Sequence, residues 1–273
     1  MAIDLTSLWN FRDPALSEAR FRAALADATG DDAIILRTQI ARTLGLRRDF
    51  DGARQALREL EPLLHVAGAE ARARHRLEVG RTHASATHRP EDVTDDARTL
   101  ARAAFEEARA LARANALDAL EIDAIHMLAF VDTTPEAQLH WAREALAVSL
   151  SSLQPDATRW QPSIRNNVGY ALHQLGRLDE ALDEFRLALA LRERGTDASA
   201  TRVARWMVAW TLRSLGRVDE ALAMQQALET DCDAAGAPDP YVFDELSALH
   251  RARGDDAAAA RYAEQAAQAR AAK

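Results

Sequence analysis

The chain has 273 residues, of which 48% are hydrophobic and only 5% aromatic, and its formal net charge at pH 7 is −8. An acidic balance argues against a nucleic-acid binder, which normally presents a basic face, and a single cysteine excludes an intramolecular disulfide framework. The N-terminal stretch MAIDLTSLWNFRDP has neither the basic start nor the apolar centre of a secretory signal. Because no run approaches the ~18 apolar residues of a membrane span, we expect a cytoplasmic protein that does not enter the membrane.

Apolar residues recur at helical spacing along the chain, without sustained alternation, so only helices are expected. Asp13 before Pro14 indicates the start of a first helix that runs to about residue 28. The later helices are expected in pairs, separated by short breaks that contain Gly, Pro or Asp. Their approximate ranges are 32–46 and 50–64, 69–86 and 93–114, 118–131 and 135–151, 159–175 and 179–194, 199–215 and 219–235, and 240–252 and 256–271.

One segment returns at a fixed period. LGRLDEAL at Leu175–Leu182 recurs as LGRVDEAL at Leu215–Leu222, forty residues later. A fixed period that includes a glycine is typical of repeat architectures, in which each helix pair packs on its neighbours.

These repeats resemble the tetratricopeptide family, whose helix-turn-helix unit of about 34 residues has a small residue on its first helix, Gly at the turn, and Ala and an aromatic residue on its second helix. The fourth unit matches this pattern at Gly169, Gly176, Ala181 and Phe185. The fifth unit matches at Ala209, Gly216 and Ala221, with Gln225 in the aromatic position. In the first unit Arg48 stands where Gly is usual, and in the second the pair Gly80 and Phe105 fits poorly because the turn is lengthened.

The resemblance implies an all-α, right-handed α-solenoid of about six tetratricopeptide-like repeats behind an N-terminal capping helix. Residues 1–30 would form the N-terminal segment and capping helix, and residues 31–273 the solenoid. The expected units are 31–66, 67–116, 117–153, 157–196, 198–236 and 238–271.

The repeat offsets also place polar and aromatic residues on one face. On the helix expected at 159–175, Asn166, Tyr170 and His173 share a stripe roughly opposite Val168. The offset of forty residues adds Trp206, Trp210 and Arg213, and a neighbouring row contains Met207 and Glu245. On the helix expected at 199–215, the packing face is predicted to consist of Val203, Val208, Leu212 and Leu215. In tetratricopeptide-like solenoids the face with the polar and aromatic residues lines the concave groove, so the resemblance implies a groove lined by Arg42, Arg81, Asp123, His126, Asn166, Asn167, Tyr170, His173, Trp206, Trp210 and Arg213.

We expect this groove to hold a peptide or protein segment without catalysis, metal or cofactor. The two asparagines would hold peptide backbone, Arg213 with Arg42 or Arg81 would bind acidic groups, and Tyr170 with the two tryptophans would hold apolar side chains. The alternative is a small-molecule-binding or catalytic pocket in which Asp123, His126 and His173 act as acid–base groups or metal ligands. A purely structural or self-associating role is the third possibility. The phosphate-binding, nucleophile and zinc signatures GxxxxGK[ST], GxSxG and HExxH are absent.

Overall fold

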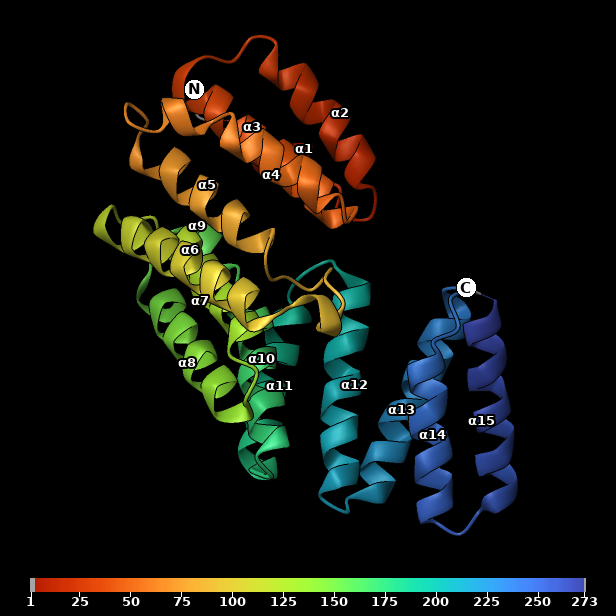
Figure 1. The fold of residues 1–273 in the computed structure, drawn as a ribbon. Helices are drawn as coiled ribbons and strands as arrows, with labels where there is room; N and C mark the ends of the chain where they lie inside the picture. Colours follow the sequence, from red (N-terminus) through yellow and green to blue (C-terminus); the bar gives the residue numbers. More distant parts are fainter. Residues whose placement is uncertain (1–2, 273) are drawn as a thin grey trace. The chain divides into compact units, whose positions relative to one another are not determined.

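The computed structural model describes residues 3–272, and that part of the chain contains helices and no strands. The helices form two compact units, Met1–Trp160 and Gln161–Lys273. Within each unit consecutive helices pack as antiparallel pairs (Figure 1). The expected all-α solenoid of six helix pairs is therefore confirmed. Among the described residues, no helix is both long and apolar enough to cross a membrane.

The first unit contains three helix pairs that follow a short N-terminal part. Its elements are α1 (Leu5–Leu8), α2 (Pro14–Leu25), α3 (Gly30–Leu46), α4 (Phe50–Arg58), η1 (Glu61–Leu63), α5 (Ala69–Arg81), η2 (Pro90–Asp92), α6 (Asp95–Ala114), α7 (Asp118–Val131), α8 (Pro135–Ser151) and α9 (Pro155–Thr158). Helix α2 begins as expected, because the Asp13 side chain accepts a hydrogen bond from the Leu16 amide and Pro14 occupies the first turn. It packs on α3 through Phe21, which is fully buried with Leu36 and Ile40.

The second unit contains the three remaining pairs. Its helices are α10 (Gln161–Gln174), α11 (Leu178–Arg192), α12 (Ala198–Ser214), α13 (Val218–Ala234), α14 (Pro240–Ala252) and α15 (Asp256–Ala271). The turns inside the pairs pass through Gly176, Gly216 and Gly254, each with φ between 72° and 77°. Glycine adopts this left-handed conformation without steric penalty, which explains its place in the repeated LGR motif.

Contact between a glycine and an aromatic ring brings the two helices of a pair close together. A Cβ atom at Gly169 would lie 2.7 Å from Cε1 of Phe185, and a Cβ at Gly80 would overlap the ring of Phe105 in the same way. The second repeat therefore keeps the packing of the fourth, although its lengthened turn made the match look poor in the sequence. The insertion lies in the connection and leaves the helix contact intact.

Two helices end much earlier than expected. Helix α4 ends at Arg58, not near residue 64, because Pro62 has no amide hydrogen and restricts Glu61, so a 3-10 turn follows. Helix α5 ends at Arg81, not near residue 86. There the His88 ring is 3.2 Å from the Thr82 carbonyl and 2.9 Å from the Ser85 hydroxyl, so the chain leaves the helix with these groups satisfied.

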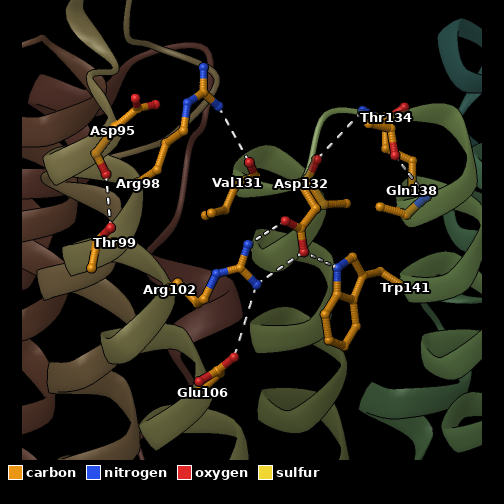
Figure 2. A network of polar contacts seen from close by, with 12 residues as sticks. Asp95, Arg98, Thr99, Arg102, Glu106, Val131, Asp132, Thr134, Gln138 and Trp141 are labelled. Carbon is orange, nitrogen blue, oxygen red and sulfur yellow. Dashed lines mark hydrogen bonds and ion pairs between the residues drawn. The ribbon is translucent and has the colours of Figure 1, made fainter.

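Asp132 joins three helices in the first unit (Figure 2). It follows α7 and accepts two hydrogen bonds from Arg102 on α6 and one, 2.8 Å long, from the indole nitrogen of Trp141 on α8. The hydrogen bond to Arg102, opposed by burial, holds the pKa of the Asp132 carboxyl below its usual range. Trp141 is thus a structural residue of this unit.

Candidate functional site

Four aromatic rings stack on one face of the second unit. Trp210 on α12 lies parallel to His173, with 3.5 Å between ring centroids, and its other neighbours are Tyr170 at 6.1 Å and Trp206 at 5.8 Å. Tyr170 is 43% exposed, and the two tryptophans are partly buried. The expected row that joins Tyr170 to Trp210 is therefore present, and neither tryptophan belongs to the buried core.

Local hydrogen bonds fix the orientation of these rings. The Trp206 indole nitrogen donates to the Tyr241 carbonyl at 3.1 Å. His173 Nε2 lies 3.0 Å from the Ser214 hydroxyl, which itself donates to the Trp210 carbonyl. Burial, with a smaller contribution from Arg213, lowers the pKa of His173, so the ring is a neutral imidazole at pH 7. The four rings are consequently uncharged, and their orientation is fixed by contacts within the protein.

The polar residues that border the rings differ in whether their side chains are already hydrogen-bonded within the protein. Arg213 donates from Nε and Nη2 to the two carboxylate oxygens of Glu245, at 2.6 and 2.8 Å, so its charge is compensated within the protein. Asn166 lies one helical turn before Tyr170 and is partly buried. Its side-chain amide makes no hydrogen bond within residues 3–272. Asn167 is also partly buried on α10.

Two expectations for α12 and its neighbours are wrong. Val203 was assigned to the packing stripe but is 54% exposed, because the buried stripe runs through Ala204, Val208 and Leu212 and a shift of one residue turns a side chain by about 100°. Met207 and Glu245 were expected in a groove row, but both are buried, with 7% and 5% of their surface exposed. The accessible face is therefore narrower than the sequence suggested.

A second cluster lies in the first unit, around a buried ion-pair network. Arg81 on α5 donates to Glu78 and to Asp123 on α7, each at 2.5 Å. Burial disfavours the Asp123 carboxylate, but Arg81 and then Arg42 outweigh this effect and hold its pKa below the usual range. The same two carboxylates raise the pKa of Arg81 against the effect of burial. Arg81 and Asp123 therefore carry their charges at pH 7.

Arg42 on α3 faces the same space but has no such partner. Its guanidinium carbon lies 5.5 Å from the ring centroids of both Trp9 and Phe11, which stack on each other at 4.6 Å. Within residues 3–272 it makes no hydrogen bond or ion pair. Burial and the charge of Arg81 lower the pKa of Arg42. Arg42 is thus a stacked cation whose donors are unused.

Arg42 and the three residues of the ion-pair network, Glu78, Arg81 and Asp123, line a cavity of about 210 Å³ in the first unit. The segment between α5 and η2 forms part of its wall, and the Thr87 hydroxyl of that segment donates to the Gly45 carbonyl on α3. His126 lies at the wall with its ring 5.4 Å from Phe130 and 5.7 Å from Trp160. Burial lowers the pKa of His126, with Asp123 opposing the effect, so the imidazole is neutral at pH 7.

The predicted site residues therefore fall into two groups. Arg42, Arg81, Asp123 and His126 lie together in the first unit, and the remaining seven lie in the second. The sequence reasoning did not find Trp9, Phe11, Phe130 or Trp160. The chain has few aromatic residues, so the two aromatic residues in the LWNF stretch, Trp9 and Phe11, could have indicated a site near the N-terminus. No group of three or more His, Cys, Asp or Glu side chains in the described part of the chain is arranged to hold a metal ion.

Comparison with known proteins agrees with this architecture. Residues 160–230, which contain α10, α11, α12 and most of α13, match the family model described as tetratricopeptide repeat. No curated protein sequence matches the chain. The crystal structure of the apo form of RapI is similar over 95% of this chain and 84% of that chain, with a TM-score of 0.61 and 13% sequence identity. BtubC (BKLC) from P. vanneervenii matches over 99% of this chain and 92% of its own, at 15% identity and a TM-score of only 0.43.

Proposed function

Because this chain is a tetratricopeptide-repeat protein, with the family pattern carried by residues 160–230, we propose that it is a binding scaffold that holds an extended peptide segment of a partner protein. The observation that carries this proposal is the set of parallel rings on the face of α10 and α12. Aromatic rings of this kind offer a large apolar contact area that loses little conformational entropy on binding. Such rings are what apolar, aromatic or proline side chains of a peptide pack against.

Asn166 gives this face a means to hold peptide backbone. A side-chain amide offers both a donor and an acceptor, which is the combination that an extended peptide bond needs. Asn166 lies beside Tyr170 on the same helical stripe and has no competing side-chain hydrogen bond within the described part of the chain. We assign it the backbone contact, with Tyr170, Trp206 and Trp210 as the apolar contacts.

Charge has a small part in the proposed interaction. Arg213 already forms a bidentate pair with Glu245, and His173 is neutral. The ligand segment is therefore expected to be apolar, and its dissociation constant should change by less than about threefold between low and high salt, since no long-range charge attraction has to be screened.

The proposal is tested by selecting peptides from a displayed random library on the full-length protein. Tyr170→Ala and Trp210→Ala are expected to weaken the selected peptides by at least about tenfold, as loss of a central aromatic contact does at protein interfaces. Leu187→Ala, which truncates another exposed apolar residue of the same unit, is the control and should leave affinity unchanged. Equal binding by all three variants, each with an unchanged helical circular dichroism signal, would contradict the proposal.

A further inference from the structure

Among the described residues that line the cavity of the first unit, one cation makes no counter-ion contact. Three basic groups face or border the cavity, but they differ in state: Arg81 is bonded to two carboxylates, His126 is neutral, and only Arg42 is charged without a hydrogen-bonded partner. Glu78 and Asp123 act on Arg42 only at longer range. A partly buried guanidinium has five N–H donors, and donors that lose water without gaining a partner are unfavourable.

Arg42 is held in place before any ligand arrives. Its guanidinium lies against the stacked rings of Trp9 and Phe11, and the Trp9 indole nitrogen donates to Gln39 at 3.1 Å, which anchors the ring to α3. Stacking of this kind favours the cation but leaves the edge of the guanidinium, where its N–H groups point, open for hydrogen bonds. The planar fork of an arginine matches a carboxylate through two parallel hydrogen bonds.

Met127, Phe130 and Trp160 give the cavity an apolar part of its wall, and the neutral His126 ring contacts both Phe130 and Trp160. Hydroxyl groups of Thr82, Ser85 and Thr87 also line it. A volume of about 210 Å³ is below the range of roughly 300–1,000 Å³ that drug-sized ligands occupy. The space therefore fits a compact apolar body that carries one polar head.

From these contacts we infer that the cavity binds a small organic monocarboxylate, with its carboxylate on Arg42 and its apolar body against Phe130 and Trp160. The formal charges of Arg42, Arg81, Glu78 and Asp123 sum to zero, so a bound monoanion leaves the site with one net negative charge and a dianion leaves it with two. Of the two arginines, only Arg42 has a guanidinium that is not already bonded to these carboxylates among the described residues, so it can hold one carboxylate and not a second anionic group. A phosphate dianion would bring a second negative charge close to the ionised Asp123 carboxylate, and the two like charges would repel each other. This site is separate from the peptide face of the second unit, and its existence does not depend on peptide binding.

The experiment uses phenylacetate and its neutral isostere phenylacetamide, together with straight-chain monocarboxylates of four to ten carbons, each titrated into the full-length protein up to about 10 mM, above the range of weak specific binding. The readout is the set of indole N–H signals in proton–nitrogen correlation spectra. The acids should shift the signals of Trp9 and Trp160 saturably while those of Trp206 and Trp210 stay in place. Phenylacetate should bind at least about tenfold more tightly than phenylacetamide, because only the acid completes the Arg42 pair.

Substitutions separate this site from general charge effects. Arg42→Gln should lower the affinity for phenylacetate at least about tenfold, and Arg42→Lys, which keeps the charge but loses the fork, should lower it by a smaller factor. Arg20→Gln removes an exposed arginine of α2 and should have no effect. If Arg42→Gln fails to fold, two other measurements decide. One is the affinity of Arg42→Lys for phenylacetate, and the other is the difference in affinity of the unaltered protein for phenylacetate and phenylacetamide. Equal binding of acid and amide, unchanged affinity in a folded Arg42 variant, or no saturable shift with any acid of the series would overturn the inference.

Discussion

Gly169 and Phe185 lie so close that any side chain at position 169 would meet the aromatic ring: a Cβ built there is 2.7 Å from Cε1 and 2.8 Å from Cδ1 of Phe185. Position 169 is on the first helix of a pair and Phe185 on the second, so this contact sets how closely α10 and α11 approach. The same relationship between Gly80 and Phe105 holds α5 against α6.

Gly169→Ala should destabilise the protein by about 1–3 kcal/mol, the usual effect of overpacking a filled core, less the ~1 kcal/mol that alanine gains in helix propensity. Gly45→Ala is the matched control, because Gly45 is also helical and a Cβ there meets nothing within 4 Å. The control should be neutral or stabilising. Urea unfolding followed by circular dichroism measures both, and a Gly169→Ala variant at least as stable as Gly45→Ala would refute the packing account.

Gln225 occupies the aromatic position of the fifth repeat, where it is fully buried and neither atom of its amide has a hydrogen-bond partner in the described part of the chain. The facing residue of the pattern is Ala209, not Gly, so there is less room for a ring. Gln225→Met keeps the approximate shape and removes the unpaired polar atoms, so it should stabilise the protein by about 1–2 kcal/mol. Thermal and urea unfolding measure the change. A loss of stability would mean that the amide has a partner, such as a buried water, that the protein needs.

Arg48 has a φ of 67°, in the left-handed region where Gly176 and Gly216 end the corresponding helices. A residue with a Cβ atom is disfavoured in this conformation by roughly 1 kcal/mol. Arg48→Gly should therefore raise the free energy of unfolding by about 0.5–1 kcal/mol, while Gly176→Ala should lower it by a similar amount. Chemical unfolding of the two variants at one pH checks both signs. A destabilised Arg48→Gly variant would show that the long ion pair of Arg48 with Asp92 outweighs the backbone preference.

His75 is 1% exposed, with Nε2 donating to the Leu57 carbonyl at 3.1 Å and Nδ1 without a partner among the described residues. Burial lowers the pKa of His75 in the folded protein below its ordinary value of 6.5. In the unfolded chain the imidazole takes up a proton as the pH falls below 6.5, while the folded protein resists this uptake. The stability that neutral His75 contributes is thus fully present above pH 6.5 and is lost as the pH falls from there through the lower folded pKa.

His75→Gln cannot titrate in this range, so the decline of unfolding free energy between about pH 7.5 and pH 5 should become shallower, by at most ~1.4 kcal/mol per pH unit for one proton. Urea titrations at several pH values measure the slopes. Parallel curves for His75→Gln and the unaltered protein would contradict the assignment.

The helix pairs were predictable because their signals are local. Proline, glycine and capping residues mark helix ends within a few positions, and apolar spacing marks the buried faces. The repeat offset also placed Tyr170 beside Trp210 correctly, since the turn sequence that defines the offset lies on the same helices. The early end of α4 before Pro62 was not predicted, although it follows from the same local rules.

The state of the charged groups was not predictable in this way. Arg213 and Arg81 were expected to be available for acidic ligands, but their carboxylate partners, Glu245 and Asp123, lie 32 and 42 residues further along the chain. Arg81 also has a local partner, Glu78, on its own helix. Whether Arg213 meets Glu245 and Arg81 meets Asp123 depends on how separate helices pack, which the spacing of residues within one helix does not show. The stacking of Trp9 on Arg42 likewise joins an irregular segment to α3 and follows no repeat.

The central claim is that the rings of the second unit form the contact surface for a partner's peptide. The most direct measurement records indole N–H signals during titration of a library-selected peptide into the protein. The account predicts that Trp206 and Trp210 shift saturably and together, while Trp141, held by Asp132 in the first unit, does not move. Saturable binding that leaves both Trp206 and Trp210 unshifted would contradict it.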